Sequence, residues 1–301
     1  MSNPALHQQS AGPAAPAQPA RQRSLWLDSL RRMARNPGAI LGLVLLVLMI
    51  AAALLAPQIT RYDPAEIVPR DRLQAPNAAH WFGTDAFGRD IYTRVVYGAR
   101  ISLLVGVVAV AIATLLGVTL GLLAGYFGGL TDALIMRGVD VMLAFPGILL
   151  ALVIVAVLGP DLLNAMVAVG ISSAPTYARV TRSAVLQTKT NLYIEAATVA
   201  GVPTWQIVLR HLLPNILGPI VVVTTLGVAG AIISGASLSF LGLGAKPPTP
   251  EWGLMLSEGR SFLRQAWWIT TFPGLAIMLT VLAINLLGDG LRDALDPRMQ
   301  K

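Results

Sequence analysis

The chain has 301 residues, of which 55% are hydrophobic and only 12% are charged, and its mean hydropathy is +0.66. Soluble domains carry roughly 25% charged residues, so this composition excludes a soluble enzyme and predicts an all-α polytopic membrane protein. The absence of cysteine excludes disulfides, thiolate metal sites and a cysteine nucleophile. The net charge of +7 fits membrane orientation better than nucleic-acid binding.

The N-terminal region precedes the first predicted membrane span. Residues 1–24 are rich in Ala, Pro and Gln and predict a disordered cytoplasmic tail. Residues 25–37 place Trp26, Leu30 and Met33 at helical spacing beside arginines. A short basic helix of this kind lies on a membrane surface, so we expect an interfacial amphipathic helix here.

Six apolar runs are considered as membrane spans, and most match a hydrocarbon core of about 30 Å. They cover residues 38–56, 102–125, 139–158, 162–178, 216–238 and 267–287. Residues 57–101 form a loop after the first span, the other five spans form a core over residues 102–288, and residues 289–301 are expected to form a cytoplasmic tail.

The distribution of basic residues predicts the orientation. Thirteen of the 22 Lys and Arg residues lie on one side if the N-terminus is placed inside. An excess of Lys and Arg marks the cytoplasmic side, so we expect both termini to be cytoplasmic. Residues 57–101 and 239–266 then form the outer loops, and residues 179–215 form the large inner loop.

Motifs for nucleotide, metal or proton chemistry are missing from the sequence. No lysine follows a Gly-rich phosphate-binding loop. The histidines His7, His80 and His211 lack metal-ligand spacing. Deep in the spans only Asp140 is ionisable, and it follows Arg137 closely, which disfavours proton-coupled transport. We therefore expect no catalytic residue, metal or cofactor in this chain.

The most informative segment covers residues 191–215. Asn191 is expected to cap a short helix, and Gly201 to end it in a left-handed conformation. Pro203 suits the start of a second helix, which Pro214 is expected to close before the fifth span. The resulting helix-turn-helix at the inner face is either a knob that inserts into a partner or an ordinary hairpin between two spans.

This segment resembles the EAA loop of ABC importer permeases, which forms the coupling helix that docks on the ATPase subunit. The matching residues are Glu195, Ala196, Ala197, Gly201, Leu213 and Pro214. One position departs from the general pattern, because His211 stands where the family usually has Ile.

Four further segments are similar to the "C" permease subunits of dipeptide, oligopeptide and nickel importers, and the resemblance extends over roughly residues 25–300. They are His80–Leu103, Gly125–Gly129, Gly242–Leu256 and Gly288–Arg298. The resemblance implies a type I ABC importer permease fold with a cytoplasmic EAA coupling loop, in the bacterial cytoplasmic membrane.

The partners that the resemblance implies are a second homologous permease, two ATPase subunits that bind ATP and Mg, and an extracytoplasmic substrate-binding protein. It implies transport of dipeptides or short peptides. The alternatives are the same fold carrying nickel or another small solute, a stand-alone channel or ion-coupled carrier, and a non-transporting scaffold.

The outer loops permit a more modest interpretation from their residues. Thr84 and Asp85 are expected to cap a helix running into the second span, and Asp90 and Arg94 to form an i,i+4 pair. These features serve either interfacial anchoring or substrate contact. Three tryptophans suit the outer headgroup belt: Trp252, Trp267 and Trp268.

The second span carries Gly117, Gly121 and Gly125 at four-residue intervals. Small residues at this spacing let a neighbouring helix approach closely. We expect a helix-packing face, with the neighbour in this chain or in a partner subunit.

Overall fold

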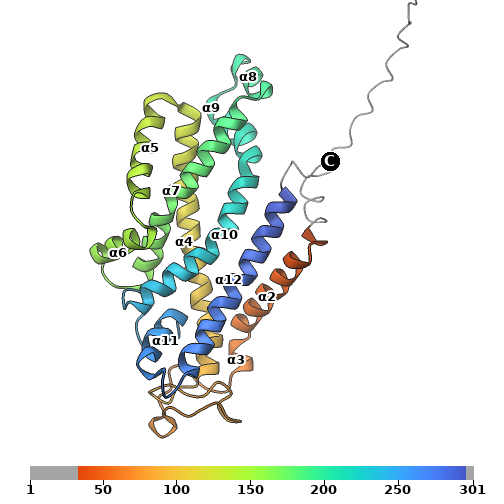
Figure 1. Cartoon of the computed structure of the whole chain (residues 1–301). Helices are drawn as coiled ribbons and strands as arrows, with labels where there is room; N and C mark the ends of the chain where they lie inside the picture. Colours follow the sequence, from red (N-terminus) through yellow and green to blue (C-terminus); the bar gives the residue numbers. More distant parts are fainter. Residues whose placement is uncertain (1–32, 296–301) are drawn as a thin grey trace, which may run out of the picture.

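The computed structural model describes residues 33–295 (Figure 1). The tail predicted for 1–24 and most of the amphipathic helix predicted for 25–37 lie outside the described residues. Every regular element within 33–295 is helical, which confirms the predicted all-α class. The longest are α2 (Pro37–Leu54), α4 (Ile91–Phe127), α7 (Leu162–Lys189), α10 (Leu213–Phe240) and α12 (Trp268–Leu295).

Shorter helices complete the two ends of the bundle. One end, here called the α8 end, carries α8 (Leu192–Val199), α9 (Thr204–Gln206) and the π-helical turn η2 (Ile207–Leu212). The opposite end, called the loop end, carries the remaining short helices and the long loop before α4. Those helices are α3 (Ala56–Ile59), η1 (Pro69–Asp71), α11 (Trp252–Gly259) and η3 (Arg260–Phe262).

The third predicted span is not one straight helix. A single helix over 139–158 is not what forms, because α5 (Gly129–Leu143) and α6 (Gly147–Leu158) meet at 95°. Pro146 has no N–H for a helical hydrogen bond and disfavours a helical conformation at Phe145, so the chain turns between the two helices. Four helical stretches are long and apolar enough to cross a membrane, or five if the bent pair counts as one span.

The fourth predicted span corresponds to α7, which is 28 residues long but does not reach that apolar composition. It includes Asn164, Ser172 and Arg179. It packs along α4, and α4 also contacts α10, while α12 packs between α10 and α2. The buried position of α7 therefore compensates for its polar composition.

Three helix boundaries differ from the sequence prediction. α4 begins at Ile91, so the last part of the predicted loop 57–101 is helical, and Asp90 caps it by accepting a 2.8 Å hydrogen bond from Thr93 N. α12 continues to Leu295, so residues 289–295 are not a tail. Gly290 lies close against Ala39 of α2, and this packing supports the helix beyond its predicted end.

The third difference concerns Pro214, which does not close a helix. α9, η2 and α10 run as one stretch over Thr204–Phe240. In η2 the chain widens to π-helical bonds, and Leu213 N donates to the Val208 carbonyl five residues earlier. A π-turn rearranges the hydrogen bonds that a proline would otherwise break. The second hairpin helix is therefore continuous with the fifth predicted span.

The glycine ladder of α4 faces α7 of the same chain. A Cβ atom placed on Gly117 would lie 2.4 Å from Tyr177 Cβ, and one on Gly121 would lie 2.5 Å from the Ala178 carbonyl oxygen. At Gly125 the nearest atom would be Val185 Cβ, at 2.8 Å. The three glycines are buried, and their missing side chains permit the close α4–α7 contact.

Candidate functional site

The hairpin at the α8 end is anchored by apolar side chains. Ile194 of α8 is buried against Ile207 and Leu212 of η2, and the cluster extends into α7 and α10 through Val185 and Ile216. Burial of this kind contributes about 1.5–3 kcal/mol per large side chain. These contacts attach the hairpin to α7 and α10.

The turn of the hairpin has the predicted left-handed glycine. Gly201 has φ +74°, and the Val202 N–H donates to the Ala197 carbonyl at 3.1 Å. The Gly201 N–H donates to the Thr198 carbonyl, also at 3.1 Å, so α8 ends in a Schellman motif. The predicted Asn191 side-chain cap is absent, because its Nδ2 instead donates to the Thr188 carbonyl.

The structure distributes the EAA residues over two sides of the hairpin. Exposed side chains belong to Glu195, Ala196 and Pro214, and Gly201 is exposed at the turn. Half-buried Ala197 and Leu213 pack against the anchor cluster. The motif therefore combines residues that hold the hairpin with residues on its outer surface.

Three large apolar residues on the hairpin surface escaped the sequence analysis. The exposed fraction is 82% for Leu192, 89% for Val199 and 65% for Trp205. Apolar residues left exposed beside a polar motif mark an interaction surface. For the two residues of α8 the spacing carried the signal, because Leu192 lies two positions before buried Ile194 and Val199 five after it, and residues at these intervals point to different sides of a helix.

Ion pairs join α5 to α7 near the α8 end. Arg182 donates from Nε and Nη2 to the two carboxylate oxygens of Asp132, each at 2.5 Å, and Arg179 donates to Asp140 at 2.7 Å. The sequence drew attention to Asp140 beside Arg137, but the structure pairs it with Arg179 of another helix. These contacts tie the bent α5–α6 unit to the core.

A network of charged side chains lies at the loop end. Arg89 donates to Asp85 at 2.6 Å and to Glu258 of α11 at 2.8 Å. Arg94 of α4 donates to the same Glu258 oxygen at 3.3 Å and lies 3.8 Å from Asp85. Arg89 and Arg94 are 3% and 1% exposed, so the network ties the loop, α4 and α11 together inside the protein.

The sequence-based pairing at this end is wrong. Asp90 binds His80 at 2.9 Å and caps α4, so it does not pair with Arg94. Asp85 accepts from the Phe87 and Arg89 N–H groups instead of capping α4. A turn of the loop brings His80 to Asp90, and α11 brings Glu258 to Arg94, so contacts from outside the helix replace the expected pair.

The tryptophan belt also differs from expectation. Trp252 and Trp268 are buried, and their indole N–H groups donate to the Val95 and Thr84 carbonyls at 2.9 and 3.1 Å. Only Trp267 of the predicted three is exposed. Trp252 therefore anchors α11 to α4, and Trp268 anchors α12 to the loop before α4.

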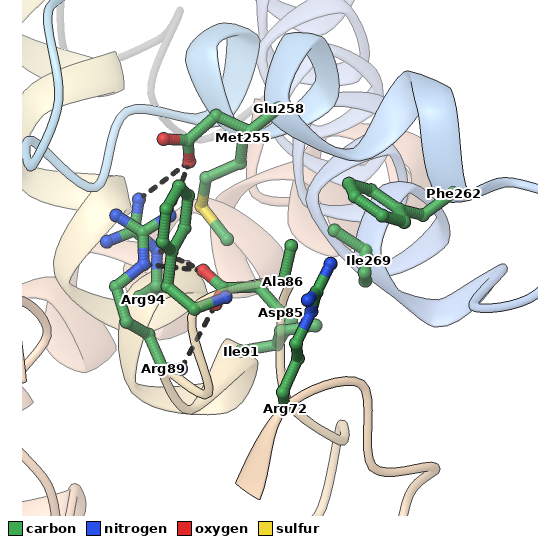
Figure 2. A pocket seen from close by; sticks show the side chains of 11 residues that line it. Arg72, Asp85, Ala86, Arg89, Ile91, Arg94, Met255, Glu258, Phe262 and Ile269 are labelled. Atoms are coloured by element: carbon green, nitrogen blue, oxygen red, sulfur yellow. Dashed lines mark hydrogen bonds and ion pairs between the residues drawn. The ribbon is translucent and has the colours of Figure 1, made fainter. Parts of the chain in front are cut away.

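A cavity of about 500 Å³ opens beside the charged network. Figure 2 shows the Arg89–Asp85–Glu258–Arg94 network on one side and Phe262 and Ile269 on the other. Arg72 reaches into this second side from the loop. The pocket thus combines an ion-paired wall with an apolar wall.

Comparison with known families and proteins identifies the family of this chain. Residues 117–301 match the model of the binding-protein-dependent transport system inner membrane component. Residues 24–76 match the N-terminal TM domain of oligopeptide transport permease C. These two matches cover the first helix and every helix after α4.

Close relatives are named as peptide transporter permeases. The dipeptide transport system permease protein DppC of Alkalihalophilus pseudofirmus is 51% identical over 92% of this chain and 91% of its own. The di/tripeptide permease DppC of Pseudomonas aeruginosa is 43% identical over 98% of each chain. The glutathione permease GsiD of Escherichia coli is 49% identical, covering 94% and 93%.

Solved structures show the same fold. The MetNI methionine ABC transporter in an inward-facing form superposes with a TM-score of 0.54 at 23% identity, over 67% of this chain and 96% of that chain. The chain therefore belongs to the family of binding-protein-dependent transport system inner membrane components, multi-pass permease subunits with the fold of ABC importers.

Proposed function

We propose that this chain is one of two membrane subunits of an ATP-driven importer for dipeptides or other short peptides. The names of the relatives support this cargo, since they refer to dipeptides, di/tripeptides and glutathione. A second permease, two ATPases that bind ATP and Mg, and an extracytoplasmic binding protein complete the assembly. The chain itself needs no cofactor.

The α8 hairpin is the proposed contact with an ATPase. One observation carries this assignment: the hairpin exposes Leu192, Val199 and Trp205, and its second half is continuous with α10. A partner that moves the exposed surface moves a membrane-spanning helix with it. Such a movement is what alternating access between two membrane faces requires.

The α8 end is proposed to face the cytoplasm, with both chain termini on that side. The distribution of Lys and Arg supports this orientation. Because the chain has no cysteine, single cysteines introduced at exposed Glu195 and Glu66 provide a direct test. A membrane-impermeant maleimide added to intact spheroplasts should label Glu66→Cys and spare Glu195→Cys; the opposite pattern contradicts the orientation.

The coupling role is tested by Val199→Glu, with Gln187→Glu as the matched control. Both positions are exposed, and both changes add one negative charge near the α8 end. We expect Val199→Glu to reduce co-purification of the ATPases by roughly tenfold or more, since a charge replaces a desolvated apolar contact. Gln187→Glu should keep them bound. Retention of the ATPases by Val199→Glu would refute the assignment.

Cargo is tested by uptake into proteoliposomes that hold the assembled complex. Labelled dipeptide should enter only with ATP and binding protein present. Labelled nickel should not enter under the same conditions. Nickel uptake without dipeptide uptake would make nickel the cargo in place of dipeptides, and the assignment as a permease would stand.

A further inference from the structure

The cavity at the loop end has the size of a small-molecule site. Its volume of about 500 Å³ falls within the range of about 300–1,000 Å³ of ligand pockets. It is lined from the loop, α4, α11, η3 and α12. A cavity between so many elements is held open by the fold and does not depend on one flexible loop.

The charges around the cavity do not cancel. Three arginines and two carboxylates line it. Arg89 and Arg94 are both bound to Asp85 and Glu258. Arg72 makes no ion pair within residues 33–295 and is exposed. One positive charge at the cavity is therefore available to a ligand.

The backbone around Arg72 fixes where this charge lies. Leu73 adopts φ 55°, a conformation that costs a branched residue about 1–2 kcal/mol, and its N–H donates to the Asp85 carbonyl at 3.0 Å. The Leu73 side chain packs into the apolar cluster around Trp252. Leu73 thus packs inward while its neighbour Arg72 lines the cavity.

A second close contact holds the same segment. Gly88 has φ +78°, and a Cβ there would lie 1.9 Å from the Val68 carbonyl oxygen. The turn before Arg89 thus rests directly on the chain that leads to Arg72. Both sides of the cavity mouth are preorganised, which lowers the entropy lost when a ligand binds.

The opposite wall is apolar. Phe262 and Ile269 line it, and Figure 2 shows Arg72 extending toward Ile269 on the side of Phe262, while Met255 lies beside Glu258. A ligand that fills this part carries a negative group next to an apolar group. The C-terminal residue of a short peptide has this chemistry, with a carboxylate and a side chain on one carbon.

We propose that the loop-end cavity binds the C-terminal residue of a short peptide. Its carboxylate is held by the guanidinium of Arg72, and its apolar side chain packs on Phe262 and Ile269. Guanidinium matches a carboxylate with two parallel N–H donors. The choice of a peptide as ligand rests on the proposed function, whereas the preference for a carboxylate next to an apolar group rests on the cavity.

The test compares Arg72→Gln with the control Arg70→Gln in the assembled complex, without binding protein. Arg70 is the neighbouring arginine, lies 3.9 Å from Asp71 and does not line the cavity. Equilibrium dialysis with radiolabelled Ala-Phe should show that Arg72→Gln binds the peptide at least roughly tenfold more weakly than the wild type does. Arg70→Gln should bind like the wild type. Ala-Phe-amide should bind the wild type as weakly as Ala-Phe binds Arg72→Gln.

A second variant addresses the apolar wall. Phe262→Ala should weaken binding of Ala-Phe roughly tenfold and leave binding of Ala-Gly nearly unchanged. Equal binding of Ala-Phe and its amide, or an Arg72→Gln variant that binds Ala-Phe like the wild type, overturns the proposal. An Arg72→Gln variant that loses affinity only for the binding protein also overturns it, and assigns the arginine to a protein contact.

Uptake separates this proposal from the proposed function. If the complex imports Ala-Phe and its amide equally and Arg72→Gln changes neither, the cavity proposal fails and peptide import stands. If the complex binds Ala-Phe with the expected preferences but imports no peptide, the cargo assignment fails and the cavity assignment stands.

Discussion

The two ends of the bundle are held together by different kinds of contact. At the loop end, four charged side chains are paired inside the protein, and two buried tryptophans bond to carbonyl groups. At the α8 end, the hairpin is held by a small apolar cluster and leaves Leu192, Val199 and Trp205 exposed.

This difference predicts which end resists rearrangement and which end a partner can move. Paired charges in a water-poor interior are costly to separate, so the loop end resists rearrangement of α4 against α11. An apolar anchor lacks directional bonds and permits small rotations, while its exposed residues offer contact area. The loop end therefore acts as a frame, and the α8 end as a surface that a partner moves.

The largest expected effect comes from breaking the frame. Glu258→Ala leaves buried Arg89 and Arg94 to share Asp85 alone, and should lower the free energy of unfolding by about 3–5 kcal/mol. Thermal unfolding of the purified chain in detergent measures it. The control is Arg179→Ala at the α8 end. The side chains of Arg179 and its partner Asp140 are 59% and 58% exposed, so losing this pair should lower the free energy of unfolding by less than about 1 kcal/mol. Equal effects would remove the distinction between the ends.

The next effect concerns the contact between α4 and α7 that joins the two ends. Gly121→Ala places a Cβ within 2.5 Å of the Ala178 carbonyl oxygen and should cost about 1–3 kcal/mol. Gly230→Ala in α10 meets no atom within 4 Å and should be neutral or stabilising by up to about 1 kcal/mol. Denaturant unfolding of both variants tests this, and a stable Gly121→Ala would contradict the packing role of the ladder.

A smaller and local effect is expected at the hairpin turn. Gly201→Ala fits the available space, since no atom lies within 4 Å of the new Cβ, but forces alanine to φ +74°. The cost is about 1–2 kcal/mol, and hydrogen exchange should accelerate in α8 while the loop end keeps its protection. Gly201→Asn should lose less, because Asn tolerates this conformation. Faster hydrogen exchange at both ends would show that the stability of the loop end depends on the hairpin turn.

The smallest effect is a pH dependence of the frame. Burial raises the pKa of Glu251 above the usual range of glutamate, although its carboxylate accepts hydrogen bonds from Gly253 and Leu254 N–H. Between the ordinary and the raised pKa, Glu251 binds its proton more tightly in the folded protein than in the unfolded chain. The free energy of unfolding should therefore fall as pH rises through that window. Glu251→Gln should remove this slope, whatever its absolute stability. An unchanged slope would assign the pH dependence to other groups.

Sequence patterns predicted features that depend on neighbours along the chain. The left-handed Gly201 followed from its place at the end of a short helix, and the all-helical membrane class followed from composition. The break before α6 was overlooked because the apolar run continues through Pro146. The partners of Asp90 and Arg94 differ from the i,i+4 prediction because a turn of the preceding loop brings His80 to Asp90, and the packing of α11 against α4 brings Glu258 to Arg94.

By itself, the sequence determined that this chain is a helical membrane protein and, through Glu195–Ala197 and Gly201, which family it resembles. Composition and short-range spacing suffice for both, because they act within one helix or one turn. Only the tertiary structure decided which charges pair, that the hairpin continues into α10, and that Arg72, which has no ion-pair partner within residues 33–295, stands beside an apolar wall. Those features join segments far apart in the chain, where packing and burial outweigh local preference.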